Sequence, residues 1–232
     1  MTKKFIALLL ALACVLSLAA CGKKNETPDP APTTITAEYT HGFVDMALEL
    51  PEGWSWETVT DDGDSKTEGI RFYKTDDTTV SYTLLCWTGG YGICGTGVTS
   101  EELTLAGGQK VCQHTDQDAE KGTMSMADIF FEDTPGSYVA SPSETMTTQV
   151  WNANRDALLS ILGTAQIGRK SLSQQAAIDA AKAIYTGEYD AVYGTYDVTS
   201  GAWIISFSKG TAGGTADRVT VDAAGKAMLG TK

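Results

Sequence analysis

The chain has 232 residues, of which 42 % are hydrophobic, and this is enough to form one large core or two small ones. It carries 29 Asp and Glu residues against 17 Lys and Arg residues, so its formal net charge is -12 at pH 7. A surface this acidic disfavours nucleic acid as a partner, and it disfavours attachment to anionic lipid through a basic patch. We therefore expect no nucleic-acid binding and a membrane attachment of another kind.

The N-terminus has the pattern of an export signal. Lys3 and Lys4 precede an apolar stretch over residues 5–16, and small residues follow. The stretch is shorter than the roughly 20 apolar residues that a membrane-spanning helix needs. Leu18-Ala19-Ala20-Cys21 then resembles the lipobox of bacterial lipoproteins, in which the chain is cleaved before the cysteine, whose sulfur carries a diacylglycerol.

The lipobox resemblance implies a signal peptide over residues 1–20 and a lipidated Cys21. It also implies a protein anchored to the cell membrane and facing outside the cytoplasm. An ordinary signal peptide with an incidental cysteine is the alternative. Residues 22–37 contain three of the six prolines and almost no apolar side chains, so we expect a flexible linker over residues 21–38.

A first folded domain is expected over residues 39–168. Phe43, Met46, Leu48 and Leu50 roughly alternate with polar or small residues, which indicates a strand that ends at Pro51. Residues 69–73 and 80–87 are rich in β-branched and aromatic side chains and are expected to form neighbouring strands. Further short strands are expected over residues 103–105, 109–114 and 124–131.

One helix closes this predicted sheet. Trp151, Leu158, Ile161 and Leu162 recur at near-helical spacing, Asn152 or Asn154 is the expected N-cap, and Gly163 the expected end. The arrangement resembles the PsbP-like α/β fold. The resemblance is carried by Leu50-Pro51-Glu52-Gly53-Trp54, by Gly69-Ile70-Arg71-Phe72 and by the closing helix to Ile161-Leu162-Gly163-Thr164.

A second domain is expected over residues 169–232. Residues 171–185 form an alanine-rich helix with Ile178, Ala181, Ile184 and Tyr185 on one face, ending at Gly187. Three antiparallel strands follow over residues 191–198, 202–208 and 218–222, and in the second of them Trp203, Ile205 and Phe207 share a face. The fold class is thus α+β: an antiparallel sheet with a closing helix, plus a small domain of one helix on three strands.

The C-terminal segment resembles a PepSY-like domain, on Leu172-Ser173-Gln174-Gln175-Ala176-Ala177-Ile178-Asp179-Ala180-Ala181, Tyr196-Asp197-Val198, Trp203-Ile204-Ile205-Ser206-Phe207 and Val219-Thr220-Val221-Asp222-Ala223-Ala224-Gly225-Lys226. Residues 210–215 form an insertion relative to the usual pattern. The resemblance implies an exported module that binds a protein or peptide, peptidases among them. It assigns no catalytic residue to this chain.

The cysteines allow two interpretations. Cys86 and Cys94 lie symmetrically about Gly90, so a hairpin would bring them opposite each other as a disulfide in an oxidising compartment. The alternative is that these two and Cys112 are small buried hydrophobes. Cys112, His114 and Asp116 share one face of a strand, but alternate residues stand roughly 6.5–7 Å apart, too far for a nucleophile and its base.

Other patterns are weaker. Residues 90–95 fit G-x-G-x-x-G, but the residues after them do not open a helix. Residues 61–64 and Asp76-Asp77 lack the spacing of a calcium loop, and His41 is the only other histidine. We expect no metal, no cofactor and no catalytic residue, while Trp56 has no predicted place.

The sequence favours a non-enzymatic, lipid-anchored extracytoplasmic protein that binds an envelope protein or peptide, with an exposed strand edge as the docking feature. Two alternatives stay open. One is a small-molecule-binding lipoprotein with a pocket between the two domains. The other is an exported thiol-dependent enzyme that uses Cys112 and His114.

Overall fold

The computed structural model describes residues 33–61, 67–87, 97–118, 123–210 and 217–230. By its contacts the chain divides into Met1–Thr33 and one compact unit, Thr34–Lys232. Among the described residues, no helix is long and apolar enough to cross a membrane.

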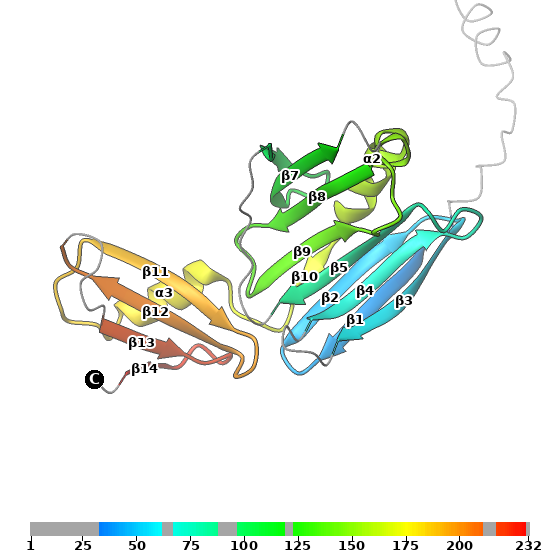
Figure 1. Cartoon of the computed structure of the whole chain (residues 1–232). Helices are drawn as coiled ribbons and strands as arrows, with labels where there is room; N and C mark the ends of the chain where they lie inside the picture. Colours follow the sequence, from blue (N-terminus) through cyan, green and yellow to red (C-terminus); the bar gives the residue numbers. More distant parts are fainter. Residues whose placement is uncertain (1–32, 62–66, 88–96, 119–122, 211–216, 231–232) are drawn as a thin grey trace, which may run out of the picture. The chain divides into compact units, whose positions relative to one another are not determined.

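The fold is dominated by three antiparallel sheets, and the described residues include two helices (Figure 1). The largest sheet has seven strands in the order β3-β4-β5-β9-β8-β7-β6. Its strands are β3 (Trp54–Asp61), β4 (Thr67–Lys74), β5 (Ser81–Trp87), β6 (Thr99–Thr104), β7 (Lys110–Asp118), β8 (Thr123–Phe131) and β9 (Ser137–Pro142). The prediction that the strands around residues 69–73 and 80–87 are neighbours is confirmed, because β4 pairs with β5.

A smaller sheet has the order β1-β2-β10, with β1 (Ile35–His41), β2 (Val44–Leu50) and β10 (Gln166–Ile167). β1 packs against β3 and β4. The folded unit therefore includes residues 35–38, which were expected to be linker. The reason is tertiary, because pairing with β2 satisfies the β1 backbone and buries Ala37 and Tyr39.

The segment from Leu50 to Trp54 is a strand end, a tight turn and a core aromatic. Trp54 N–H donates to Pro51 O at 3.3 Å, and Gly53 has φ +86°, a conformation that glycine adopts without strain. Trp54 is buried against Phe72, with ring centroids 6.0 Å apart.

Helix α2 (Thr148–Leu162) packs against β2 and β8 and completes the core of this region. Its buried residues are the four predicted ones, Trp151, Leu158, Ile161 and Leu162, and the Trp151 ring stacks on Tyr82 at 5.5 Å. The helix ends at Gly163 as predicted.

The predicted N-cap of α2 was wrong. Thr147 is the cap, and its side chain accepts a hydrogen bond from Val150 N–H at 3.2 Å. Asn154, one of the two predicted caps, lies inside the helix, where its amide donates to Val150 O and accepts from Lys74 Nζ. The helix thus begins before both asparagines.

The C-terminal sheet has four strands in the order β11-β12-β13-β14, with β11 (Ala191–Asp197), β12 (Ala202–Ser208), β13 (Asp217–Val221) and β14 (Ala227–Leu229). The predicted sharing of one face by Trp203, Ile205 and Phe207 is confirmed, since all three are buried. β14 is a fourth strand that the sequence did not indicate.

Helix α3 (Gln174–Lys182) covers that face and is shorter than predicted. It begins after the N-cap Ser173 and ends at Ala183. Tyr185 lies beyond the helix, where its ring stacks on Phe207 with centroids 4.0 Å apart. Tyr185 is therefore held by packing on the sheet and not by a further turn of the helix.

Candidate functional site

A groove of about 300 Å³ lies along β11, an edge strand of the C-terminal sheet. We call it the β11 groove. Gly194, Thr195 and Tyr196 of β11 form one side. The remaining lining residues are Phe130, Phe131, Asp133, Thr134, Gly136, Ser137 and Tyr138 from the end of β8 to the start of β9, with Gln174 of α3 and Trp203 of β12.

The polar side-chain atoms of Tyr196 and Trp203, which line the groove, are engaged by residues outside its lining. Tyr196 Oη lies 2.6 Å from Ser171 Oγ, and Trp203 Nε1 donates to Leu172 O at 2.9 Å. The Tyr196 and Trp203 rings pack against each other with centroids 5.1 Å apart. Burial raises the pKa of Tyr196, so its hydroxyl is neutral at physiological pH.

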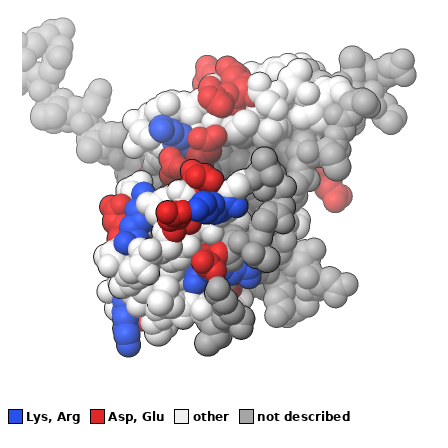
Figure 2. Space-filling model, turned by 90° about the vertical axis from the view of Figure 1, so that its left-hand side faces the viewer, with Lys and Arg blue, Asp and Glu red and all other residues white. Residues whose placement is uncertain are grey.

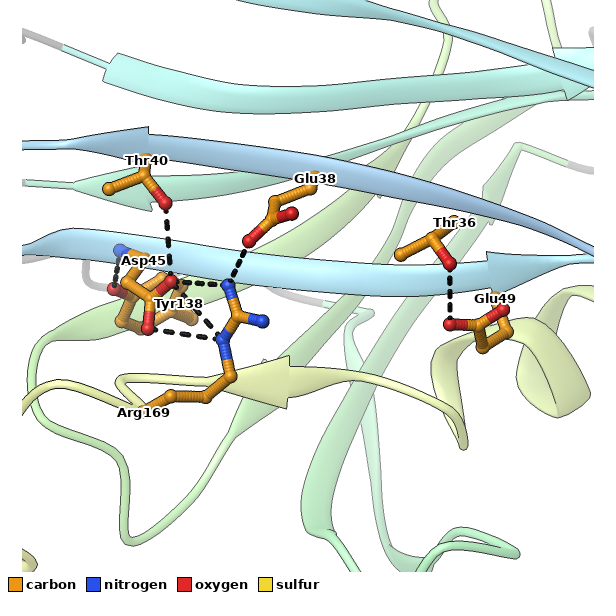
Figure 3. A network of polar contacts seen from close by, with 7 residues as sticks. All are labelled: Thr36, Glu38, Thr40, Asp45, Glu49, Tyr138 and Arg169. Carbon is orange, nitrogen blue, oxygen red and sulfur yellow. Dashed lines mark hydrogen bonds and ion pairs between the residues drawn. The ribbon is translucent and has the colours of Figure 1, made fainter.

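Tyr138 is fixed by a polar network around Asp45 (Figure 3). Asp45 N–H donates to Tyr138 Oη at 3.3 Å, and burial raises the pKa of Tyr138. The Asp45 side chain is fully buried, and its Oδ1 accepts from Arg169 Nη2 at 2.6 Å. Arg169 Nη2 also lies 2.6 Å from Glu38 Oε1. The network thus joins β1, β2 and β9 to the segment that follows β10.

Burial of Asp45 opposes its ionisation, but the hydrogen bonds and charge of Arg169 outweigh this and lower the pKa of the carboxyl group. Asp45 is therefore ionised at neutral pH. Two residues after Arg169, Ser171 makes its contact with Tyr196. The ion pair thus anchors the chain that leads into α3, while Tyr138, on the opposite wall of the groove, contacts the backbone N–H of the same Asp45.

Two glycines of the lining have little room for a side chain. A Cβ on Gly136 would lie 2.9 Å from Val198 Cγ1, and this glycine has φ +121°, which other residues rarely adopt. A Cβ on Gly194 would lie 3.0 Å from Ile205 Cδ1 and 3.2 Å from Trp203 Cε3. Larger residues at either position would fill or distort the groove.

β11 is alternately exposed along its length, and its Tyr193 is 52 % exposed. Gln174 Nε2 donates to Gly194 O at 3.1 Å, so a side chain satisfies this edge-strand carbonyl. An unpaired edge strand offers backbone donors and acceptors to another chain.

Exposed apolar side chains are concentrated near this sheet. Six large hydrophobic residues are exposed in the described part of the chain, and five of them lie between residues 184 and 229: Ile184, Tyr189, Tyr193, Met228 and Leu229. Charges on the face shown in Figure 2 are mixed, with Lys and Arg beside Asp and Glu. Large exposed hydrophobic residues are therefore more frequent near the C-terminal sheet than elsewhere among the described residues.

The residues predicted as lipidation and disulfide sites fall largely outside the described ranges. Cys21 and Cys94 both lie outside them, so the predicted pairing of Cys86 with Cys94 stays a prediction. Cys86 is buried in β5, and burial raises the pKa of its thiol to about 12. It lies opposite Tyr138 in the sheet register.

Cys112, His114 and Asp116 lie on β7 as predicted. His114 Nδ1 lies 2.9 Å from Ser100 Oγ, and its ring packs edge-on against Phe130. Burial and the nearby Glu132 and Glu102 raise the pKa of Cys112, which disfavours the thiolate that a nucleophile requires. His114 is thus hydrogen-bonded to the hydroxyl group of Ser100 in β6.

The remaining candidates have structural roles where they are described. His41 Nδ1 lies 2.7 Å from Glu68 Oε2, and Asp77 accepts hydrogen bonds from Thr79 in a turn. Trp56 packs half-buried against the core. Within the described ranges, no group of three or more His, Cys, Asp or Glu residues could hold a metal ion. Residues 62–64 and 90–95 lie outside those ranges.

Sequence reasoning missed the wall of the groove formed by residues 130–138. One signal was available, because Asp133-Thr134-Pro135-Gly136 is a typical turn sequence between two strands. It marks the turn but does not show which strand of the C-terminal sheet lies beside it. Comparisons of this chain with protein-family models, curated proteins and solved structures found no match.

Proposed function

We propose that this protein is a non-enzymatic, lipid-anchored extracytoplasmic binding protein that takes up an extended polypeptide segment along β11. Cys21 carries the lipid in this proposal, and residues 169–232 form the PepSY-like module that contacts the partner. The PsbP-like region over residues 39–168 supplies the second wall of the groove. A peptidase is one partner that the C-terminal resemblance implies.

One observation carries the proposal: an edge strand runs along an aromatic-lined groove. Adding a strand to an open edge gives affinity through main-chain hydrogen bonds, and a neighbouring pocket selects alternate side chains. An extended segment paired with β11 would place its side chains in the β11 groove. The exposed Tyr193 on the same strand adds apolar contact area.

The test uses the purified full-length protein and a phage-displayed library of random short peptides. We expect enriched peptides to bind the wild type, with binding competed by the same synthetic peptide free in solution. Two analogues of the best peptide, methylated on alternate backbone nitrogens, then test the mode of binding. A peptide that adds as a strand directs alternate N–H groups to β11, so one analogue loses binding and the other keeps it.

Equal binding of both analogues would contradict strand addition. A library from which the protein enriches no peptide would contradict peptide binding. A protein variant that displaces β11 is Gly194→Val, whose side chain meets the buried Ile205 and Trp203, and we expect it to weaken binding. Tyr193→Ser tests the exposed ring without altering the buried face.

A small ligand is the second candidate, because the groove volume of about 300 Å³ is at the lower end of the range for ligand pockets. Such a ligand needs no strand edge. A compound that binds in the groove and is displaced equally by both methylated peptides would favour this candidate.

A further inference from the structure

The lining of the β11 groove carries charge of one sign only, and that sign is negative. Its twelve residues include five aromatic rings and a single ionisable carboxyl group, that of Asp133, and they include no Lys or Arg. The tyrosine and tryptophan polar atoms described above are engaged outside the groove. Asp133 therefore carries the one formal charge among the lining residues of the groove.

Asp133 stands out among the lining residues by its backbone. It has φ +56° and is the one non-glycine residue with positive φ in the described ranges. Left-handed backbone is uncommon for non-glycine residues, and Asp and Asn tolerate it best. It lies in the segment between β8 and β9 and lines the groove together with Thr134 and Gly136.

The other hydroxyl and amide groups of the groove include two that are already used as donors. Thr134 Oγ1 donates to Gly136 O at 3.0 Å, and Gln174 Nε2 donates to Gly194 O at 3.1 Å. A positive charge entering the groove would find one counter-charge there, the exposed Asp133. A carboxylate accepts a charge-assisted hydrogen bond from an ammonium or guanidinium group.

We infer that the β11 groove selects a basic side chain, Lys or Arg, of the bound polypeptide, with Asp133 as the recognising carboxylate. This inference rests on the proposed function, because the polypeptide delivers the side chain to the groove. The net charge of -12 favours the same partner, since an acidic protein attracts a basic segment at long range.

The experiment compares synthetic peptides that are identical except at one position. The parent is the tightest library peptide that contains a Lys, and its analogues carry N-acetyl-lysine or norleucine there. Affinities are measured by calorimetry with full-length wild-type protein. We expect the Lys peptide to bind about five- to ten-fold more tightly than either analogue, a difference typical of one hydrogen bond to a charged group.

Asp133→Asn is the decisive variant. Asparagine tolerates the same backbone conformation, so the turn is kept while the charge is lost. We expect this variant to bind all three peptides with similar affinity. Glu132→Gln is its matched control: it removes the same charge from the adjacent exposed residue, which does not line the β11 groove, and should keep most of the preference for Lys.

The outcomes separate this inference from the proposed function. Peptides that bind along β11 without any preference for Lys or Arg, or a preference that survives in Asp133→Asn, would overturn the basic-side-chain inference alone. Failure of every library peptide to bind the wild type would overturn the proposed function itself.

Discussion

Asp45 is a fully buried carboxylate whose partner, Arg169, is 35 % exposed at its side chain. The two members of the pair therefore respond differently to mutation. Without Arg169, a negative charge stays buried without its counter-ion, whereas without Asp45 the arginine can turn towards water.

We predict that Arg169→Gln lowers the free energy of unfolding by about 3–5 kcal/mol, and that Asp45→Asn lowers it less. Urea titrations followed by circular dichroism measure both. Lys209→Gln is the control, since its pair with Glu188 is exposed on both sides and contributes at most about 1 kcal/mol. Equal losses for Arg169→Gln and Lys209→Gln would contradict a structural role for the buried pair.

The same pair predicts a pH dependence. The pKa of Asp45 is lowered in the folded protein from an ordinary value of 3.8, so its stabilising contribution is fully present above that value. It is lost as the pH falls through the lowered folded-state pKa. The stability difference between wild type and Asp45→Asn should thus be constant from pH 5 to pH 7 and shrink below about pH 4. A difference that grows on acidification would contradict the assignment.

The two described cysteines should react slowly with iodoacetamide at neutral pH. Burial raises the pKa of Cys86 to about 12, and burial with nearby glutamates raises the pKa of Cys112. Mass spectrometry after brief alkylation should show both cysteines largely unmodified in the native protein and modified in urea with a reductant present. Fast native modification of Cys112 would instead favour the thiol-dependent enzyme.

At the scale of elements, the start of α2 offers two adjacent threonines with opposite roles. Thr147 caps the helix, whereas the Thr148 hydroxyl is buried and has no hydrogen-bond partner in the described part of the chain. We predict that Thr147→Ala costs about 1 kcal/mol of stability and that Thr148→Ala is neutral or stabilising. Thermal unfolding of both variants is the measurement, and the reverse order would show that the cap is misassigned.

The elements that sequence reasoning predicted best have strong periodicity. The four buried residues of α2 and the alternating Trp203, Ile205 and Phe207 of β12 were recognised because each side chain repeats with the period of its element. β10, with two residues, and β14, with three, are too short to show any period. Their pairing is decided by the neighbouring strands.

At the scale of the whole unit, the site could not be predicted because its walls are far apart in the sequence. Residues 130–138 and 194–196 meet only in the folded chain. The sequence did favour an exposed strand edge and, as an alternative, a pocket between the two regions. The sequence does not show which strand edge borders the pocket or that Asp133 lines it, because both depend on tertiary packing.

The core of Thr34–Lys232 is continuous, with buried residues from all three sheets in one cluster. We predict that Phe207→Ala, in the C-terminal sheet, lowers the unfolding midpoint of the whole unit and not of the last sixty or so residues alone. Hydrogen exchange measured across the chain tests this. Loss of protection confined to β11–β14, with the seven-stranded sheet unchanged, would show that the two regions unfold independently.

The start of β1 determines where a mechanical load on the N-terminal segment enters the folded unit. In the proposed lipoprotein, a pull on the membrane anchor reaches the folded unit at Ile35, which pairs with Leu50 at one end of the β1–β2 ladder. Antiparallel pairing in a hairpin lets tension open such a ladder one pair at a time, beginning at that end. Ala37 and Tyr39, both buried, and the contact of Glu38 with Arg169 follow within four residues. Tension would therefore meet this buried, ion-paired stretch before it reached the seven-stranded sheet or the groove.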